Sequence, residues 1–103
     1  MKEGEGLTVE FKERYTSKIA EDIVAMANSK GGFIVLGVND AGKMVGEKLT
    51  NYMKAEILSL GRNCEPHIMI SKVSQVDSTV VIEVPEGDGC YARNLFLIRK
   101  VLF

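Results

Sequence analysis

The sequence predicts a single α/β domain in which a mixed β-sheet carries two main helices. Two segments have apolar residues at helical spacing, and around them lie segments with the period-two alternation or the short apolar runs of strands. The 103 residues fit one domain with one hydrophobic core. The hydrophobic fraction, 46%, is ordinary for a globular protein and argues against disorder.

The first predicted element is a strand from Leu7 to Glu13, in which apolar and polar residues alternate. We expect its apolar side chains to face the core and its polar ones to face solvent. The apolar set is Leu7, Val9 and Phe11, and the polar set is Thr8, Glu10 and Lys12. A helix follows from about Ser17 to Ser29, with Ser17 as its N-cap. Gly31 is placed to end this helix in a left-handed conformation.

A continuous apolar run from Phe33 to Val38 predicts a strand that is buried on both faces. The residues from Asn39 to Gly42 then form a turn, and those from Lys43 to Gly46 form a short return strand. The apolar run is therefore expected to lie at the centre of the sheet.

The second helix is expected from Asn51 to Cys64, because Pro66 disfavours helical backbone in the residue before it. A hairpin follows, with strands from His67 to Val76 and from Thr79 to Pro85. A last strand covers about Leu95 to Phe103. We expect residues 1–6 to be a flexible N-terminus and residues 7–103 to be the domain, as the N-terminal part of a longer protein.

Charge and composition restrict the function classes. The chain has 13 basic and 14 acidic side chains, so a net charge of −1 would not draw it onto nucleic acid, and such binding needs a local patch. It has no apolar run of about 18 residues and no secretory signal. Its two separated cysteines and one histidine form no zinc pattern. We therefore expect a cytoplasmic protein with reduced thiols and no membrane partner.

Three acidic residues are candidate metal ligands: Glu5, Glu10 and Asp40. Asp40 follows the apolar strand, at the end where open α/β sheets bind ligands. Carboxylate oxygens at rigid positions can hold Mg²⁺ or Mn²⁺, which can activate water for phosphodiester cleavage. The simpler interpretation, which the pattern alone favours, is that Glu10 is a solvated strand residue and Asp40 a turn former.

The segment from Asn28 to Gly32 ends in two glycines, which could form a backbone nest for a phosphate. It lies after a helix and before a strand, however, whereas a P-loop has the reverse order, and the chain contains no P-loop motif. The favoured interpretation is therefore a helix end and a tight turn.

Six basic residues are candidate contacts to a phosphate backbone: Lys12, Arg14, Lys30, Arg93, Arg99 and Lys100. They would form one stripe if the outer strands of the sheet are neighbours. Tyr91 and Phe96 could add surfaces on which bases stack. The alternative is that these charges only solvate the surface and that Phe96 lies in the core.

Four segments, in the same order along the chain, resemble the Schlafen AlbA_2 domain family. Glu5–Lys12 resembles the family's ExxxxEFK opening, and Ala25–Gly32 resembles its AfANt-GG segment. Phe33–Gly46 resembles its i-iGV-D-G-i-G hairpin. The positions that fit its second half are Pro66, Val84–Gly87 and Arg93–Arg99. The resemblance covers nearly the whole chain.

This resemblance implies an α/β domain related to the Alba nucleic-acid-binding fold. In bacteria and archaea such domains commonly lie at the N-terminus of transcriptional regulators. Related domains in animal Schlafens carry a three-carboxylate ribonuclease site, and Glu5, Glu10 and Asp40 match its acids, while Lys12 matches the adjacent lysine. The animal enzymes use two such lobes with extra basic surface, whereas this chain has one lobe and a net charge of −1.

The leading hypothesis is a nucleic-acid-binding module without enzymatic activity, the DNA-binding part of a transcriptional regulator, which needs no cofactor. The alternative is an endoribonuclease that uses Mg²⁺ or Mn²⁺ at the three acids. A third hypothesis, an ATP-binding regulatory domain, comes only from the helicase-like or divergent ATPase labels once given to family members. The expected partners are DNA or RNA, a second copy of the chain in a dimer, and a C-terminal regulatory domain outside this sequence.

Overall fold

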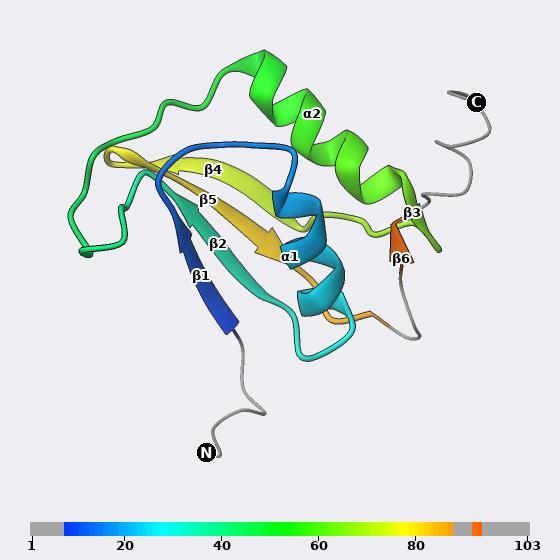
Figure 1. Ribbon diagram of the computed structural model, residues 1–103. Coiled ribbons are helices and arrows are strands. Elements are labelled where there is room, and N and C mark those ends of the chain that lie inside the picture. Colours follow the sequence, from blue (N-terminus) through cyan, green and yellow to red (C-terminus); the bar gives the residue numbers. More distant parts are fainter. Residues whose placement is uncertain (1–7, 88–91, 94–103) are drawn as a thin grey trace, which may run out of the picture.

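The computed structural model describes residues 8–87 and 92–93, and it confirms the predicted α/β class. The elements in chain order are β1 (Thr8–Lys12), α1 (Ile19–Ala27), β2 (Gly32–Leu36), α2 (Asn51–Arg62), β3 (Cys64–Glu65), β4 (Lys72–Val76), β5 (Thr79–Val84) and β6 (Ala92–Arg93) (Figure 1). The main sheet has four strands in the order β1-β2-β5-β4, and β3 pairs with β6 in a small separate sheet. β1 and β2 are parallel, whereas β5 is antiparallel to β2 and β4, so the sheet is mixed as predicted.

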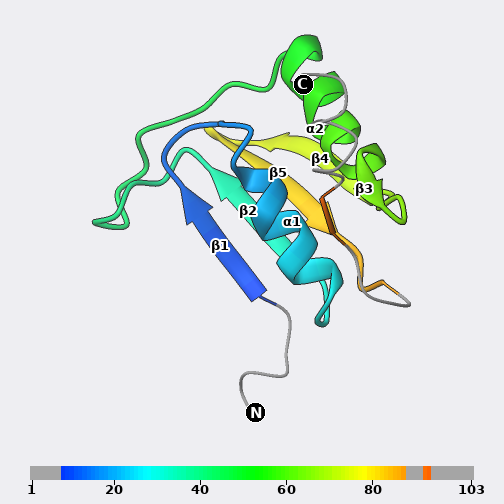
Figure 2. The ribbon, with the colours of Figure 1, turned by 45° about the vertical axis from the view of Figure 1, so that its right-hand side comes forward.

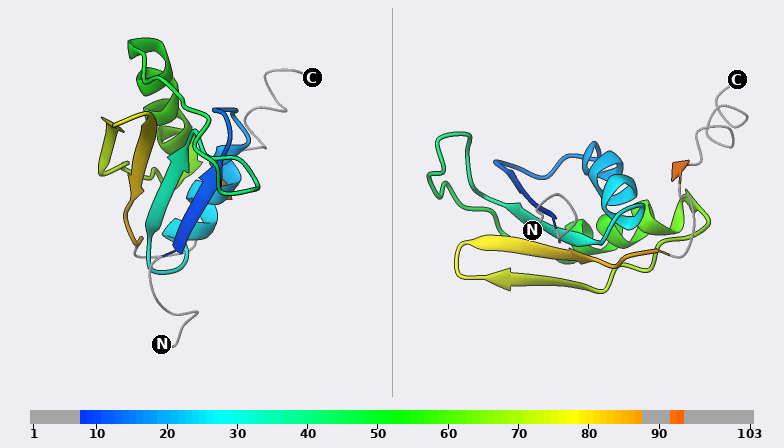
Figure 3. Two further views of the ribbon diagram at one scale, coloured as in Figure 1. Left: turned by 90° about the vertical axis from the view of Figure 1, so that its left-hand side faces the viewer. Right: turned by 90° about the horizontal axis from the view of Figure 1, so that it is seen from below.

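The hydrophobic core lies between the two helices and the one face of the main sheet that both of them cover (Figure 3). The sheet contributes alternate residues of its inner strands, such as Ile34 of β2, which is level with Ile82 of β5. Ile23 of α1 and Ile57 of α2 pack against them from above. Within the described part of the chain, the opposite face of the sheet carries no helix.

β2 is an inner strand, which confirms the central position predicted for the run from Phe33 to Val38. The expectation that this run is buried on both faces is wrong. Ile34 is fully buried, but its neighbours Phe33 and Val35 are only half-buried, because both helices lie on the other side. The strand ends before Gly37, whose φ of 108° turns the chain.

The alternation predicted in β1 is present, but the expected direction of its faces is wrong. Val9 is 48% exposed and Phe11 is 54% exposed. The parallel register places Glu10 level with Ile34, so Glu10 shares the helix-covered face and is half-buried. The open face of the sheet therefore carries two apolar side chains that the pattern assigns to the core. Leu7, which was predicted to join them, lies outside the described residues.

α1 begins two residues later than predicted. It starts at Ile19 after Lys18, which makes no side-chain capping bond, so the prediction of Ser17 as the N-cap is wrong. The termination by Gly31 is confirmed. Gly31 has a φ of 79°, and its N–H donates to the carbonyl of Met26 over 2.8 Å.

α2 begins at the predicted residue, Asn51. The Thr50 hydroxyl caps it by accepting a hydrogen bond from the N–H of Met53 over 3.0 Å. The helix ends at Arg62, two residues before the predicted end at Cys64. Cys64 instead starts β3 and is buried in the core.

The remaining elements differ in how they match the predictions. The hairpin of β4 and β5 is confirmed, although its first strand begins at Lys72 rather than His67. The return strand predicted for residues 43–46 is reduced to a single bridge between Val38 and Met44. The predicted flexible segment 1–6 and the predicted last strand Leu95–Phe103 lie outside the described residues. No helix in the described part is long and apolar enough to cross a membrane.

The two glycines before β2 are explained by backbone packing. A Cβ atom on Gly31 would lie 2.6 Å from the carbonyl oxygen of Val84, and one on Gly32 would collide with the carbonyl oxygen of Thr8. Both glycines therefore allow neighbouring strands to approach closely. This confirms the interpretation as a helix end and tight turn.

Candidate functional site

The loops that follow β1 and β2 meet at one edge of the main sheet, because the two strands are parallel (Figure 2). The N–H groups of Gly37 and Val38 donate to the carbonyl of Lys12 over 2.7 and 3.1 Å. The turn between β4 and β5 reaches the same edge, where the carbonyl of Ser78 accepts from the N–H of Glu47 over 2.8 Å. Open α/β sheets bind ligands at this side of their parallel strands. We call it the carboxyl edge.

The turn after β2 presents Asp40 to solvent beside β1. The side-chain oxygen of Asn39 accepts hydrogen bonds from the N–H groups of Ala41 (3.0 Å) and Lys43 (2.9 Å) and so closes the turn internally. Gly42 has a φ of 79°, and its N–H donates to the Asn39 carbonyl over 2.9 Å. The turn projects beyond the ends of β1 and β2 (Figure 1). Asp40 and Lys43 are both exposed on it.

A hollow of about 580 Å³ lies between β1 and this turn, and we call it the edge hollow. Its lining residues are Val9, Glu10, Phe11, Val38, Asn39, Asp40, Gly42 and Met44. Two of the three predicted acids, Glu10 and Asp40, therefore line the same hollow although they come from different elements. Glu5, the third, lies outside the described residues. Within residues 8–87 and 92–93, no three His, Cys, Asp or Glu side chains are placed to hold a metal ion.

A smaller hollow of about 240 Å³ lies between β1 and α1, and Glu10 lines it too, together with Asp22. Lys12 belongs to this side of β1, because its Nζ lies 3.4 Å from Oδ2 of Asp22 in an ion pair. The sequence pattern did not single out Asp22, since an acid in the first turn of a helix is already explained by the helix dipole. Its spacing of four residues from the buried Met26 was the available signal.

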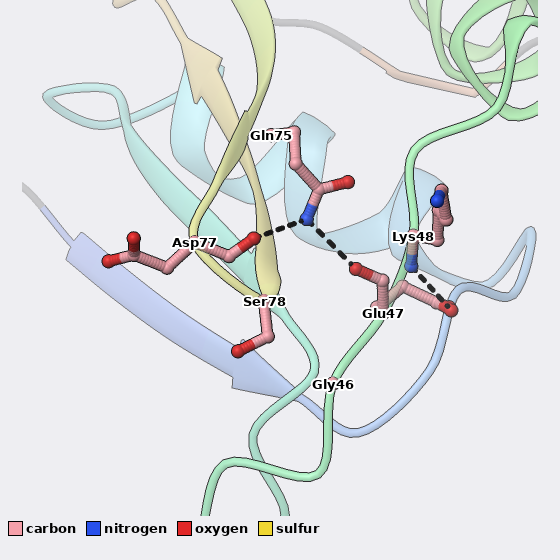
Figure 4. Close-up of a pocket in the computed structure, with 6 residues that line it drawn as sticks. All are labelled: Gly46, Glu47, Lys48, Gln75, Asp77 and Ser78. Carbon is pink, nitrogen blue, oxygen red and sulfur yellow. Dashed lines mark hydrogen bonds between the residues drawn. The ribbon is translucent and has the colours of Figure 1, made fainter.

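A third hollow, of about 520 Å³, lies between residues 46–48 and the β4–β5 turn (Figure 4). Nε2 of Gln75 donates to the carbonyls of Glu47 (3.1 Å) and Asp77 (3.0 Å). Its Oε1 accepts from the N–H of Leu49 over 2.8 Å. The Glu47 carboxylate accepts from the N–H of Tyr15 over 2.9 Å, so its charge is turned towards the protein's own backbone. These hydrogen bonds join the loop after β1, residues 46–49 and the β4–β5 turn. The sequence alone does not indicate this role for Gln75.

Three exposed cations lie at the carboxyl edge. Arg14, which was predicted, follows β1, and Lys43 and Lys48, which were not, lie in the segment after β2. Lys12 and Asp22 form the only ion pair between residues that the structure describes. Arg14, Lys43 and Lys48 therefore have no carboxylate partner in the described part of the chain. Lys43 and Lys48 were missed because only the fold brings the segment after β2 next to the end of β1.

The other predicted basic residues lie elsewhere. Lys30 precedes β2 at the opposite end of the strands, about 20 Å from the carboxyl edge at roughly 3.3 Å per residue. Arg93 is in β6, which pairs with β3 and not with β1. The remaining predicted contacts, Arg99 and Lys100, and the predicted stacking residues, Tyr91 and Phe96, lie outside the described residues.

Comparison with known proteins places this fold in a family. A family model described as "Schlafen, AlbA_2" matches residues 5–100. A search of curated proteins finds no match. Among solved structures, the DIP2311 protein from Corynebacterium diphtheriae is similar over 92% of this chain, with a TM-score of 0.60 and 17% sequence identity. The likeness shows a shared fold, and this chain spans 20% of the length of that one.

Proposed function

We propose that this chain, which belongs to the Schlafen AlbA_2 family, is a nucleic-acid-binding module whose carboxyl edge contacts the phosphate backbone. The observation that carries the proposal is the group of exposed cations at this edge, Arg14, Lys43 and Lys48, which have no described carboxylate as partner. Cations of this kind bind phosphates and release the counterions condensed on them. A local patch is what a chain with a net charge of −1 needs for such binding.

A binding titration with labelled single-stranded and duplex DNA and RNA tests the proposal. We expect a Kd in the range of about 10⁻⁴–10⁻⁶ M, with an affinity that falls steeply as salt increases. Arg14→Ala, Lys43→Ala and Lys48→Ala should each lower the salt slope by about one. Arg62→Ala, at the far end of α2, should leave it unchanged. Failure of the wild type to bind any of these nucleic acids would overturn the proposal.

Two further predicted contacts, Lys30 and Arg93, belong to the proposed surface if the bound nucleic acid extends beyond the carboxyl edge. Alanine variants of Lys30 and Arg93 measure whether contacts continue to the opposite end of the domain. Lys12 is half-buried and paired with Asp22, so its contribution to binding requires that this ion pair open. We expect Lys12→Ala to change the salt slope less than Arg14→Ala does.

We further propose that the module is the DNA-binding part of a transcriptional regulator and that it acts as a dimer, with a regulatory domain outside this sequence. The family supports the regulator role. The sequence from Leu95 to Phe103, in which seven of nine residues are apolar and which we predict to be a strand, supports self-association, because apolar strand edges tend to associate. Light scattering should give twice the chain mass of 11.3 kDa, and a clean monomer at high concentration would remove the dimer.

The second candidate function is a metal-dependent ribonuclease, which is favoured by one observation: Glu10 and Asp40 line the same hollow. Mg²⁺ accepts one or two carboxylates directly and keeps several waters. The described residues place no group of three such ligands, so by themselves they do not form a metal centre. Glu5 would have to complete the set.

Cleavage of a structured RNA with Mn²⁺ tests this alternative. If the acids are catalytic, Glu10→Gln and Asp40→Asn should each abolish the activity of the wild type while leaving the melting temperature unchanged. Equal activity in all three proteins would indicate a contaminating nuclease. No activity in any of them would leave the binding module as the function.

A further inference from the structure

We propose that the edge hollow binds one unpaired nucleobase of a single-stranded nucleic acid, stacked on the ring of Phe11. This inference rests on the proposed nucleic-acid function and specifies its ligand. The edge hollow combines a concave surface, an exposed aromatic ring and side chains that can bond to a base edge.

The ring of Phe11 is exposed although phenylalanine is large and apolar. It is 54% exposed, on the face of the sheet that the helices leave open, and Val9 lies two residues earlier on the same face. In the parallel register Phe11 is level with Val35 of β2, whose side chain is half-buried. An aromatic ring on the surface of a sheet is a stacking platform for bases, because every base has a flat π-face.

The opposite wall of the hollow is fixed by the turn after β2. Met44 lines the hollow, and its Sδ accepts a hydrogen bond from the Ser78 hydroxyl over 3.2 Å. Val38, another lining residue, pairs with Met44 in a β-bridge. A thioether makes favourable contacts with a flat ring system. The hollow thus offers apolar groups on two sides, and its volume of about 580 Å³ suits a ligand of small-molecule size.

The polar lining matches the edge of a base that carries an amino group. The carboxylate of Asp40 is an acceptor, and the exocyclic amino groups of cytosine, adenine and guanine are donors. Asn39 already uses its side-chain oxygen within the turn, which leaves its amide N–H groups as donors. Lys43 is exposed on the same turn, and we expect it to contact the phosphate of the bound nucleotide. We therefore expect tighter binding of amino-bearing bases than of thymine or uracil.

The same lining favours a base over a second copy of the chain as the occupant. A twofold contact brings the same patch of both subunits together. Here it would bring the exposed Asp40 of one copy near the Asp40 of the other, and like charges that meet in an interface are unfavourable. A nucleotide avoids this conflict, because its base enters the hollow while its phosphate stays outside with Lys43.

The experiment uses the absence of tryptophan from the chain. Phe11→Trp introduces a single fluorophore at the proposed platform, and Tyr52→Trp introduces one on α2, where Tyr52 is 74% exposed. We expect oligo-dC or oligo-dA to quench the fluorescence of Phe11→Trp but not that of Tyr52→Trp. In the original background, Phe11→Leu should weaken binding of these strands by about 5- to 150-fold, the range for loss of one stacked base. Tyr52→Leu should leave the affinity unchanged.

Each outcome decides between the inference and its alternatives. Quenching at residue 11 together with weaker binding of oligo-dT than of oligo-dC or oligo-dA supports the inference. If the wild type binds nucleic acid but Phe11→Leu binds equally well and Phe11→Trp is not quenched, the inference falls and the proposed function stands. If the wild type binds no nucleic acid, both fall. If Phe11→Leu changes the mass in light scattering and leaves the affinity intact, the face is an interface between copies and the inference is wrong.

Discussion

Two glycines with the same backbone conformation have different surroundings in this molecule. Gly31 and Gly42 both have a φ of 79°, which residues other than glycine adopt only with strain. A Cβ on Gly31 would lie 2.6 Å from the Val84 carbonyl oxygen, whereas one on Gly42 would have no atom within 4 Å. Alanine substitutions at the two positions therefore distinguish the free-energy cost of backbone strain from that of a steric collision.

This difference gives a prediction for urea unfolding. Gly42→Ala should lower the free energy of unfolding by about 1–2 kcal/mol, the cost of the left-handed conformation alone. Gly31→Ala should lower it by about 3–5 kcal/mol, because the backbone of β5 must also move. Equal losses in the two variants would contradict the packing role assigned to Gly31.

Tyr15 is a second residue whose surroundings have a measurable consequence. Its hydroxyl is buried and has no hydrogen-bond partner among the described residues. Burial, followed by the neighbouring Glu56 carboxylate, raises the pKa of Tyr15 well above its usual value of 10. The folded protein therefore keeps this proton at a pH at which the unfolded chain releases it.

The sign of the pH dependence follows from this difference. The contribution of Tyr15 is fully present below the unfolded pKa, and stability is lost as the pH rises above about 10. Between about pH 9 and 11 the wild type should lose more of its free energy of unfolding than Tyr15→Phe does. Parallel pH curves for the wild type and Tyr15→Phe would contradict the burial of this hydroxyl.

At the scale of elements, β1 and β2 show what periodicity predicts and what it leaves open. The alternation in β1 and the apolar run of β2 identified both strands correctly. Alternation does not say which face meets the helices, and in β1 the apolar residues Val9 and Phe11 lie on the open face. An apolar run likewise does not show whether a second layer covers the strand. The choice of face depends on the register with β2, which no local pattern contains.

The two faces of β2 give a prediction with a matched pair of substitutions. Ile34→Asp buries an unpaired charge in the core and should cost more than about 4 kcal/mol or prevent folding. Val35→Asp, one residue further on the open face, should cost only about 1–2 kcal/mol, because Val35 is half-buried. Thermal unfolding followed by circular dichroism measures both. A Val35→Asp variant as unstable as Ile34→Asp would show that another layer covers the open face.

At the scale of the whole molecule, the fold class, the central strand and both helices could be predicted from the sequence, because each depends on local periodicity. The sequence pattern offered Glu10 and Asp40 as members of one candidate site while favouring a simpler interpretation, and the family resemblance strengthened the site hypothesis. Asp22, Gln75 and the placement of Lys43 beside β1 could not be predicted, because their roles depend on contacts between segments far apart in the chain. The site is thus a product of the parallel pairing of β1 and β2.

The central claim is that the carboxyl edge binds nucleic acid through its three cations. The most direct measurement compares the salt dependence of nucleic-acid binding in three proteins: the wild type, an edge variant and a matched variant. The edge variant has alanine in place of Arg14, Lys43 and Lys48. The matched variant loses the same charge elsewhere, with alanine in place of Lys54, Arg62 and Lys72. A plot of log K against log salt should be less steep by about 3 for the edge variant, because each lost phosphate contact removes about 0.9 from the slope. The matched variant should keep the wild-type slope. The same slope in all three proteins, or an equal loss in both variants, would contradict the claim.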